Sequence, residues 1–186
     1  QVIDPLLNET TFVYDDLNRL TKETIVVNSV TLDRIYAYDD AGNRSSIIDR
    51  NDRERQFDYD ELDRVTDEHW IENSLPINTS SWDYDDLSRV ISAGDDVDYT
   101  YSYDNQGRLT SHKRTDNTSV PTIEYVITYD DAAGTVERTE KIGSVNRAKD
   151  TITLDTLSRV TQIKQDGLGS QDTDKRVDYT YDGVGN

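Results

Sequence analysis

The segment YSYDNQGRLT, residues 101–110, carries the pattern that decides the fold. Its Tyr-Asp pair returns along the chain, each time followed by a polar turn and usually by an aliphatic residue. The eight copies start at these residues: Tyr14, Tyr38, Tyr59, Tyr84, Tyr103, Tyr129, Leu154 and Tyr181. The mean spacing is about 24 residues, which lies in the period range of stacked-repeat architectures.

Large apolar residues precede each turn at alternate positions. If the Tyr of Tyr-Asp is position zero, position −2 is aromatic or Ile in every copy, with mostly small or polar residues between. This alternation predicts a half-buried strand. The rings at positions zero, −2 and −4 form an aromatic ladder, which includes Tyr14, Tyr36, Tyr38, Phe57, Tyr59, Trp82, Tyr84, Tyr101, Tyr103, Tyr129, Tyr179 and Tyr181. We expect these rings to be a buried core rather than a platform for sugars, so Tyr101→Ala is predicted to cost about 3–5 kcal/mol.

The residues after the Tyr predict a hairpin turn. Position +1 is always an acid that can accept backbone N–H groups, as in Asp15, Asp39, Asp60, Asp85, Asp104, Asp130 and Asp155. Position +4 favours left-handed backbone, as at Gly42 and Gly107. Position +5 is Arg in five copies: Arg19, Arg64, Arg89, Arg108 and Arg159. We expect this Arg to reach the +1 carboxylate and the edge of a Tyr ring. Copy six has Ala133 followed by Gly134, which indicates a one-residue insertion.

If positions zero and +6 are both buried, they should oppose each other across a five-residue loop. Each unit is then one hairpin plus a connector of variable length, such as 113–121 or 73–79. A lone hairpin is marginal in water, so we expect the hairpins to stack. The predicted fold is all-β: an array of stacked antiparallel β-hairpins forming a β-solenoid or curved sheet, in a single domain over residues 1–186.

The composition favours a repeat array rather than a globular fold with a conventional hydrophobic core. Val, Ile, Leu and Phe total 42 of 186 residues, close to the fraction at which chains tend to be disordered. The net charge of −18 argues against nucleic acid or an anionic membrane as partner, and the chain has no Cys to form disulfides. No apolar run is long enough to span a membrane. The chain lacks Met, so we expect it to be a fragment of a larger protein.

The copies at 36–43 and 101–109 resemble the RHS, or YD, repeat family, whose pattern runs Tyr-x-Tyr-Asp-x-x-Gly-Arg-Leu. The resemblance covers residues 10–186, with Asn, Asp or Ser replacing the turn Gly in several copies and Leu154 replacing one Tyr. It implies a strip of hairpins that forms part of a hollow shell. Such shells occur in bacterial RHS and wall-associated proteins, toxin complexes and teneurins. The family's self-cleavage sequence has no match here, because Asp4-Pro5-Leu6-Leu7 lacks the Gly.

Other residue groups are candidate binding, metal or catalytic sites. Trp70, with His69 beside it, is the one aromatic off the ladder, and we expect it to be a lid over the sheet or an exposed binding ring. Asp95, Asp96 and Asp98 are oxygen-rich and could hold Ca²⁺, but they match no calcium-loop pattern. The paired acids recur in nearly every copy, whereas a catalytic pair would be expected once. His112 has no nucleophile motif near it. We therefore expect no catalytic residue and no cofactor.

The sequence predicts a non-enzymatic structural module, a segment of an RHS shell in a large secreted or cell-surface bacterial protein that encloses or carries a toxin or another domain. The alternative is an adhesion module that binds carbohydrate or protein through its outer face or connectors. Expected partners are neighbouring repeats or domains of the parent chain. Unpaired strand edges could also pair into oligomers.

Overall fold

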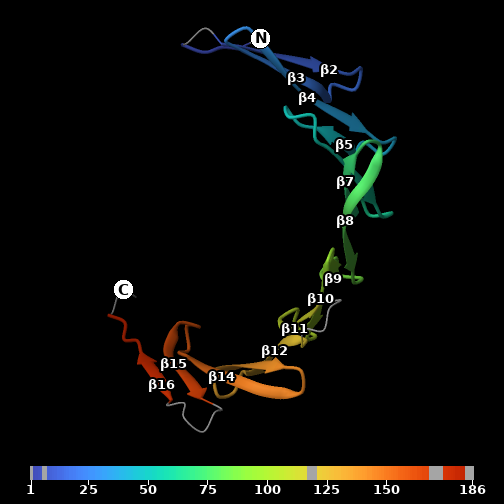
Figure 1. Cartoon of the computed structure of the whole chain (residues 1–186). Coiled ribbons are helices and arrows are strands. Elements are labelled where there is room, and N and C mark those ends of the chain that lie inside the picture. The colour runs from blue at the N-terminus through green and yellow to red at the C-terminus, as the bar shows by residue number, and fades with distance from the viewer. Residues whose placement is uncertain (1, 6–7, 117–120, 168–173, 183–186) are drawn as a thin grey trace. The chain divides into compact units, whose positions relative to one another are not determined.

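The computed structural model describes residues 2–5, 8–116, 121–167 and 174–182. Within these ranges the chain forms strands and turns, and no helix is present there. Strands that follow one another in the chain pair antiparallel, as shown by Phe12 opposite Glu23 and Tyr125 opposite Glu140. The predicted all-β fold of consecutive antiparallel hairpins is therefore confirmed (Figure 1).

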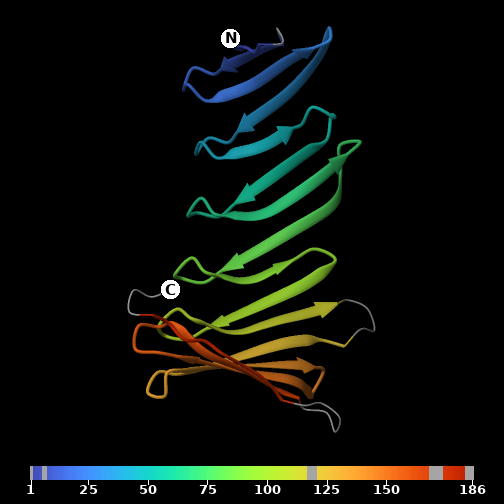
Figure 2. The same cartoon turned by 90° about the vertical axis from the view of Figure 1, so that its left-hand side faces the viewer.

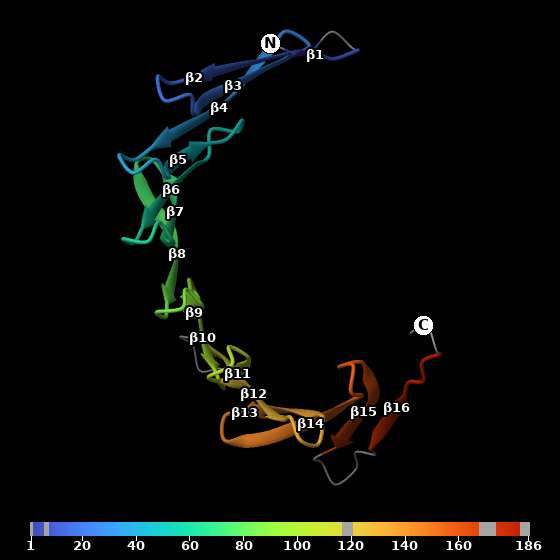
Figure 3. The same ribbon diagram turned by 180° about the vertical axis from the view of Figure 1, so that it is seen from behind.

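The chain divides into two compact units, Gln1–Asp83 and Tyr84–Asn186, which are described separately. The strands that begin in the first unit are β1 (Val2–Ile3), β2 (Glu9–Tyr14), β3 (Leu20–Val27), β4 (Val30–Tyr38), β5 (Arg44–Ile48), β6 (Glu54–Tyr59), β7 (Val65–Glu72) and β8 (Leu75–Tyr84). Those of the second unit are β9 (Val90–Gly94), β10 (Val97–Tyr103), β11 (Leu109–Asp116), β12 (Ile123–Asp130), β13 (Thr135–Ile142), β14 (Val145–Leu154), β15 (Val160–Gly167) and β16 (Lys175–Asp178). Within each unit the strands follow one another as rungs (Figures 2 and 3).

The pairing register in the Tyr-Asp hairpins is the one that the sequence predicts. Position zero opposes position +6, for example Tyr14 opposite Leu20 and Tyr103 opposite Leu109. The register shifts between positions −1 and zero of these pairs, because the strand after the turn contains one extra residue, Thr21 or Thr110. In copy six Tyr129 opposes Val136, one residue further along, which confirms the predicted insertion.

The prediction of variable connectors is wrong for residues 73–79. Asn73 and Ser74 form a two-residue turn, with φ angles of 51° and 64°, and β8 starts at the next residue. Asn28 and Ser29 repeat this turn with φ angles of 49° and 65°. Two consecutive left-handed residues suit the right-handed twist of the flanking strands. The connector at 113–121 includes residues outside the described ranges.

Alternation places the aromatic ladder on one side of the sheet, which we call the ring face. In unit 1 it carries Phe12, Tyr36 and Phe57, and in unit 2 it carries Tyr99, Tyr101 and Tyr125. The other face, called the polar face, carries Ser, Thr and charged residues; Thr24, Asp58 and Ser81 are examples.

The prediction that every ladder ring lies in a buried core is wrong. Among the described residues, only Ile47 is a buried apolar side chain, at 8% exposure. Tyr14 is 54% exposed and Tyr179 is 42% exposed, while most other ladder rings are half-buried. The physical reason is that neighbouring strands cover the edges of a ring in a single sheet, whereas full burial needs a second layer.

Candidate functional site

The repeated Tyr-Asp turns are the most regular constellation of polar side chains in the structure. In copy one, Asp15 Oδ1 accepts the backbone N–H groups of Leu17 and Arg19 at 3.0 and 2.8 Å. Asp15 Oδ2 accepts Arg19 Nε–H at 2.8 Å, and Asn18 between them has a φ of 62°. The carboxylate thus holds both the loop backbone and the Arg side chain in place.

The same three hydrogen bonds recur in four further turns, those of Asp60, Asp85, Asp104 and Asp155. Donation from the Arg64 side chain is the largest cause that lowers the pKa of Asp60 below its usual value. Donation from the Arg19 backbone is the largest cause that lowers the pKa of Asp15. Hydrogen bonding to the ionised form therefore outweighs the opposing effect of partial desolvation in these turns.

Arg side chains of these turns also contact the next repeat. The guanidinium of Arg19 lies 4.6 Å from the centre of the Tyr38 ring, and the Tyr38 hydroxyl donates to Leu20 O at 2.8 Å. We call this set the Asp–Arg–Tyr clamp. Further clamps place Arg89 over Tyr103, Arg108 over Tyr129 and Arg159 over Tyr181, at 4.1–4.5 Å, with matching hydroxyl-to-carbonyl bonds of 2.7–3.0 Å.

The Arg reaches the +1 carboxylate as predicted, but it lies over the face of the next copy's Tyr ring and not at a ring edge. Copy two lacks the Arg and has Asn43, whose Nδ2 donates to Asp63 Oδ1 at 2.6 Å, while Tyr59 still donates to Arg44 O at 2.9 Å. Successive repeats are thus joined by cation–π contacts and hydrogen bonds across the copies.

A further turn of the same type escaped the sequence analysis because no Tyr precedes it. Asp49 Oδ1 accepts the N–H groups of Asn51 and Arg53, and Oδ2 accepts Arg53 Nε–H at 2.8 Å. Asp52 has the left-handed φ of 60° that position +4 requires. The Arg53 side chain is the largest cause that lowers the pKa of Asp49, to about 2. The signal to search for is Asp followed four residues later by Arg.

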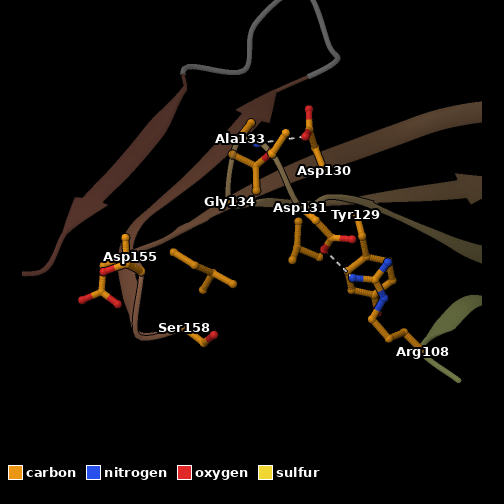
Figure 4. A pocket seen from close by; sticks show the side chains of 13 residues that line it. Arg108, Tyr129, Asp130, Asp131, Ala133, Gly134, Asp155 and Ser158 are labelled. Atoms are coloured by element: carbon orange, nitrogen blue, oxygen red, sulfur yellow. Dashed lines mark hydrogen bonds and ion pairs between the residues drawn. The ribbon is translucent and has the colours of Figure 1, made fainter. Parts of the chain in front are cut away.

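The clamp is interrupted where copy six meets copy seven (Figure 4). Thr135 stands where the Arg would be and Leu154 where the next Tyr would be, so both partners of the contact are absent together. A hollow of about 540 Å³ lies there, and Arg108, Tyr129 and Gly134 are among its lining residues.

Backbone contacts replace the clamp at this junction. Leu154 N–H donates to Gly134 O at 2.8 Å, and Gly134 has a φ of +63°. A Cβ at Gly134 would lie 3.1 Å from Leu154 O, so the close approach of these two backbone segments favours Gly. Asp130 departs from the predicted pattern, because its carboxylate accepts the N–H of Ala133. Asp131 instead receives Arg108 Nη1–H at 2.6 Å (Figure 4).

His112 lies within a group of tyrosine rings on the ring face of unit 2. Its ring centre is 5.1 Å from that of Tyr101, with the planes 5° apart. Tyr99 and Tyr125 stack on it at 5.7 and 6.1 Å. Desolvation by the surrounding residues raises the pKa of Tyr101. The repeat pattern does not indicate this stack, because His112 occupies no repeat position.

Trp70 lies in strand β7 opposite Arg55, so it is part of the sheet and not a lid over it. This register puts it on the ring face with Phe57, so Trp70 extends the ladder. It is 41% exposed, with the Arg55 guanidinium 5.7 Å from its ring. His69 points to the polar face, where its ring nitrogens contact Asp58 and Thr79 at 2.9 Å. The two neighbours in sequence therefore lie on opposite faces of the sheet.

The calcium candidates lie in and beside the turn that joins β9 to β10. Asp95 Oδ1 accepts Val97 N–H at 3.2 Å, and Asp98 is the second residue of β10. Across the described ranges, no three His, Asp or Glu side chains gather in a way that could hold a metal ion. In the same ranges, no helical segment has the length and apolarity needed to cross a bilayer.

The fold and the clamp define this chain as an antiparallel hairpin-repeat protein. Residues 38–69, which include copies two and three, match the family model described as RHS Repeat. The predicted resemblance to RHS repeats is thus confirmed. No curated protein matches the chain in sequence.

Solved structures share its fold. The chain resembles the crystal structure of TcdB2-TccC3-Cdc42 with a TM-score of 0.62 and 15% identity, over 95% of this chain and 12% of that chain. It resembles TcdB2-TccC3-TEV with a TM-score of 0.60 and 14% identity, over 97% and 12%. This chain therefore spans about an eighth of the length of these structures. At these identities the likeness concerns the fold alone.

Proposed function

We propose that this chain is a structural, non-enzymatic segment of an RHS-repeat shell in a large secreted bacterial protein. The observation that carries the proposal is the Asp–Arg–Tyr clamp, which joins a repeat to the next one with the same geometry in four places along the chain. A clamp of this kind lets a long strip form without a conventional core, because each hairpin is stabilised by its neighbours. The RHS repeat at 38–69 and the likeness of fold to TcdB2-TccC3 support this proposal.

The proposed role extends to enclosing another part of the parent chain, or a polypeptide bound to it. Enclosure is tested on the intact parent protein. An added protease should leave the enclosed polypeptide uncut until the shell is unfolded with urea, and immediate cutting would contradict enclosure.

The structural role is tested on this chain by amide hydrogen exchange. Arg89→Met removes one clamp, so exchange should rise in β9–β11 and stay unchanged in β14 and β15. Arg147→Met is the matched control, because Arg147 is exposed and makes no ion pair among the described residues. A uniform rise throughout unit 2, or no rise, would contradict stabilisation by neighbouring repeats.

The adhesion alternative is tested separately through Trp70, the ring outside the repeat positions. Glycan binding by the wild-type chain that disappears in Trp70→Ala would favour adhesion. Equal binding of both chains to a glycan array, or none, would leave the structural role as the function.

A further inference from the structure

A second hollow lies on the ring face of unit 2, across four neighbouring strands. Its volume is about 420 Å³. The lining residues all come from β13 to β16: Arg138, Asp150, Ile152, Ile163, Gln165, Lys175 and Val177. It lies where the ladder has lost its rings, because Ile152 occupies a −2 position that is aromatic in six other copies.

The floor of the hollow is a row of aliphatic side chains. Ile152 pairs with Ile163, and Ile163 pairs with Val177, so the three branched side chains lie side by side across the strands. Val177 at the end of the row is 52% exposed. A flat, partly exposed apolar row is a surface on which a planar ring can lie.

A second row of side chains runs across the same strands beside the aliphatic row, and it contains the charged residues of the hollow. Arg138 Nε–H donates to Asp150 Oδ2 at 3.0 Å, and Gln165 Nε2–H donates to Asp150 Oδ1 at 3.1 Å. These two donors engage both oxygens of Asp150, whose side chain is 13% exposed. Lys175 ends the row, is exposed, and takes part in no ion pair within the described ranges. The hollow thus holds one excess positive charge on a chain of net charge −18.

Aromatic rings of this chain cover the part of the ring face that lies next to the hollow, on strands β10 to β12. Tyr99, Tyr101, His112 and Tyr125 form a stack, and the guanidinium of Arg138 lies 5.6 Å from the centre of the Tyr125 ring. Arg138 also lines the hollow. A ring placed on the aliphatic row would therefore meet a guanidinium, as the clamp rings do, and would continue the aromatic surface.

We propose that this hollow binds an aromatic side chain that has a carboxylate on the adjacent residue, within a polypeptide held against the ring face. The ring lies on Ile152, Ile163 and Val177 beside Arg138, and the carboxylate pairs with Lys175. An aliphatic side chain would fill the floor but would gain nothing from the guanidinium. A neutral neighbour would leave Lys175 unpaired. The proposal rests on the proposed shell function, which supplies a polypeptide to this face.

The test is an NMR titration of the whole chain with three blocked dipeptides. Acetyl-Trp-Asp-amide should shift the backbone amides of β14–β16 around the hollow and saturate. Acetyl-Trp-Asn-amide, without the charge, and acetyl-Leu-Asp-amide, without the ring, should each bind about two- to fivefold more weakly. Shifts that lie elsewhere, or equal affinity for the three peptides, would overturn the proposal, as would the absence of saturation with acetyl-Trp-Asp-amide.

Two variants test the role of the charge. Lys175→Gln should remove the preference for the Asp over the Asn peptide, and its exposure makes misfolding a small concern. Lys149→Gln is the control, because Lys149 lies on the polar face of the adjacent part of β14, paired with Glu137. A preference that survives in Lys175→Gln, or disappears equally in Lys149→Gln, would refute the assigned pairing. This titration is independent of the hydrogen-exchange test, so either proposal can fail without the other.

Discussion

Removal of a single hydroxyl from a clamp, in Tyr38→Phe, isolates one contact between two repeats. The Tyr38 hydroxyl is part-buried and donates to Leu20 O at 2.8 Å. Phe keeps the ring that lies 4.6 Å from the Arg19 guanidinium, so the cation–π contact remains. The expected loss is the net value of one hydrogen bond, about 1 kcal/mol in the free energy of unfolding. For a unit of this size, that corresponds to a melting temperature lower by about 4–8 °C.

The assay is urea unfolding followed by tryptophan fluorescence. Both Trp residues, Trp70 and Trp82, lie in unit 1 with the substitution, so their emission reports on that unit. Tyr14→Phe is the matched control, because Tyr14 belongs to the first copy, is 54% exposed, and its hydroxyl makes no hydrogen bond among the described residues. Tyr14→Phe should leave the urea midpoint unchanged. Equal midpoints for the two variants would refute the clamp as a source of stability.

Three further predictions concern other parts of the array. Gly134→Ala should cost more than Gly143→Ala, about 2 against about 1 kcal/mol, because both have left-handed φ but only Gly134 places the new Cβ 3.1 Å from a backbone oxygen; urea midpoints measure the difference. Asp49 has a lowered pKa of about 2, so its contribution to stability is present above about pH 4 and is lost as the pH falls through about 2; the gap in urea midpoint between wild type and Asp49→Asn should therefore close over that range, and a constant gap would contradict the ionised turn. Tyr101→Ala should cost about 2 kcal/mol in chemical unfolding, less than the 3–5 kcal/mol of a fully buried ring, because Tyr101 is half-buried; a cost below about 1 kcal/mol would contradict a role for its stack with His112.

The repeat positions made most of the hairpin geometry predictable. The spacing from Tyr14 to Leu20 and from Tyr103 to Leu109 predicted the register, since opposed residues must share a face. The left-handed residue at position +4 and the hydrogen bonds that Arg donates to Asp also follow from local chemistry, because their partners lie within five residues along the chain.

The sequence-based prediction was incomplete where it used Tyr to locate the turns, and wrong where it expected the ladder rings to be fully buried. The Asp49 turn has the same hydrogen bonds without a Tyr, so a search for Tyr-Asp pairs missed it. The expected connector at 73–79 is mostly strand, because Asn73 and Ser74 complete the turn in two residues. Burial of the ladder was overestimated because a sequence pattern identifies the face of a strand and not what covers that face.

The amino-acid sequence alone determined the all-β class, the hairpin register and the chemistry inside each turn, since all of these depend on contacts over a few residues. Only the tertiary structure showed that Arg19 covers the ring of the next repeat, that Trp70 and His112 lie on the ring face, and that an aliphatic hollow beside Lys175 interrupts the ladder. These contacts join residues on different strands, and their geometry depends on how the pleated strands pair and bend, which local spacing does not specify.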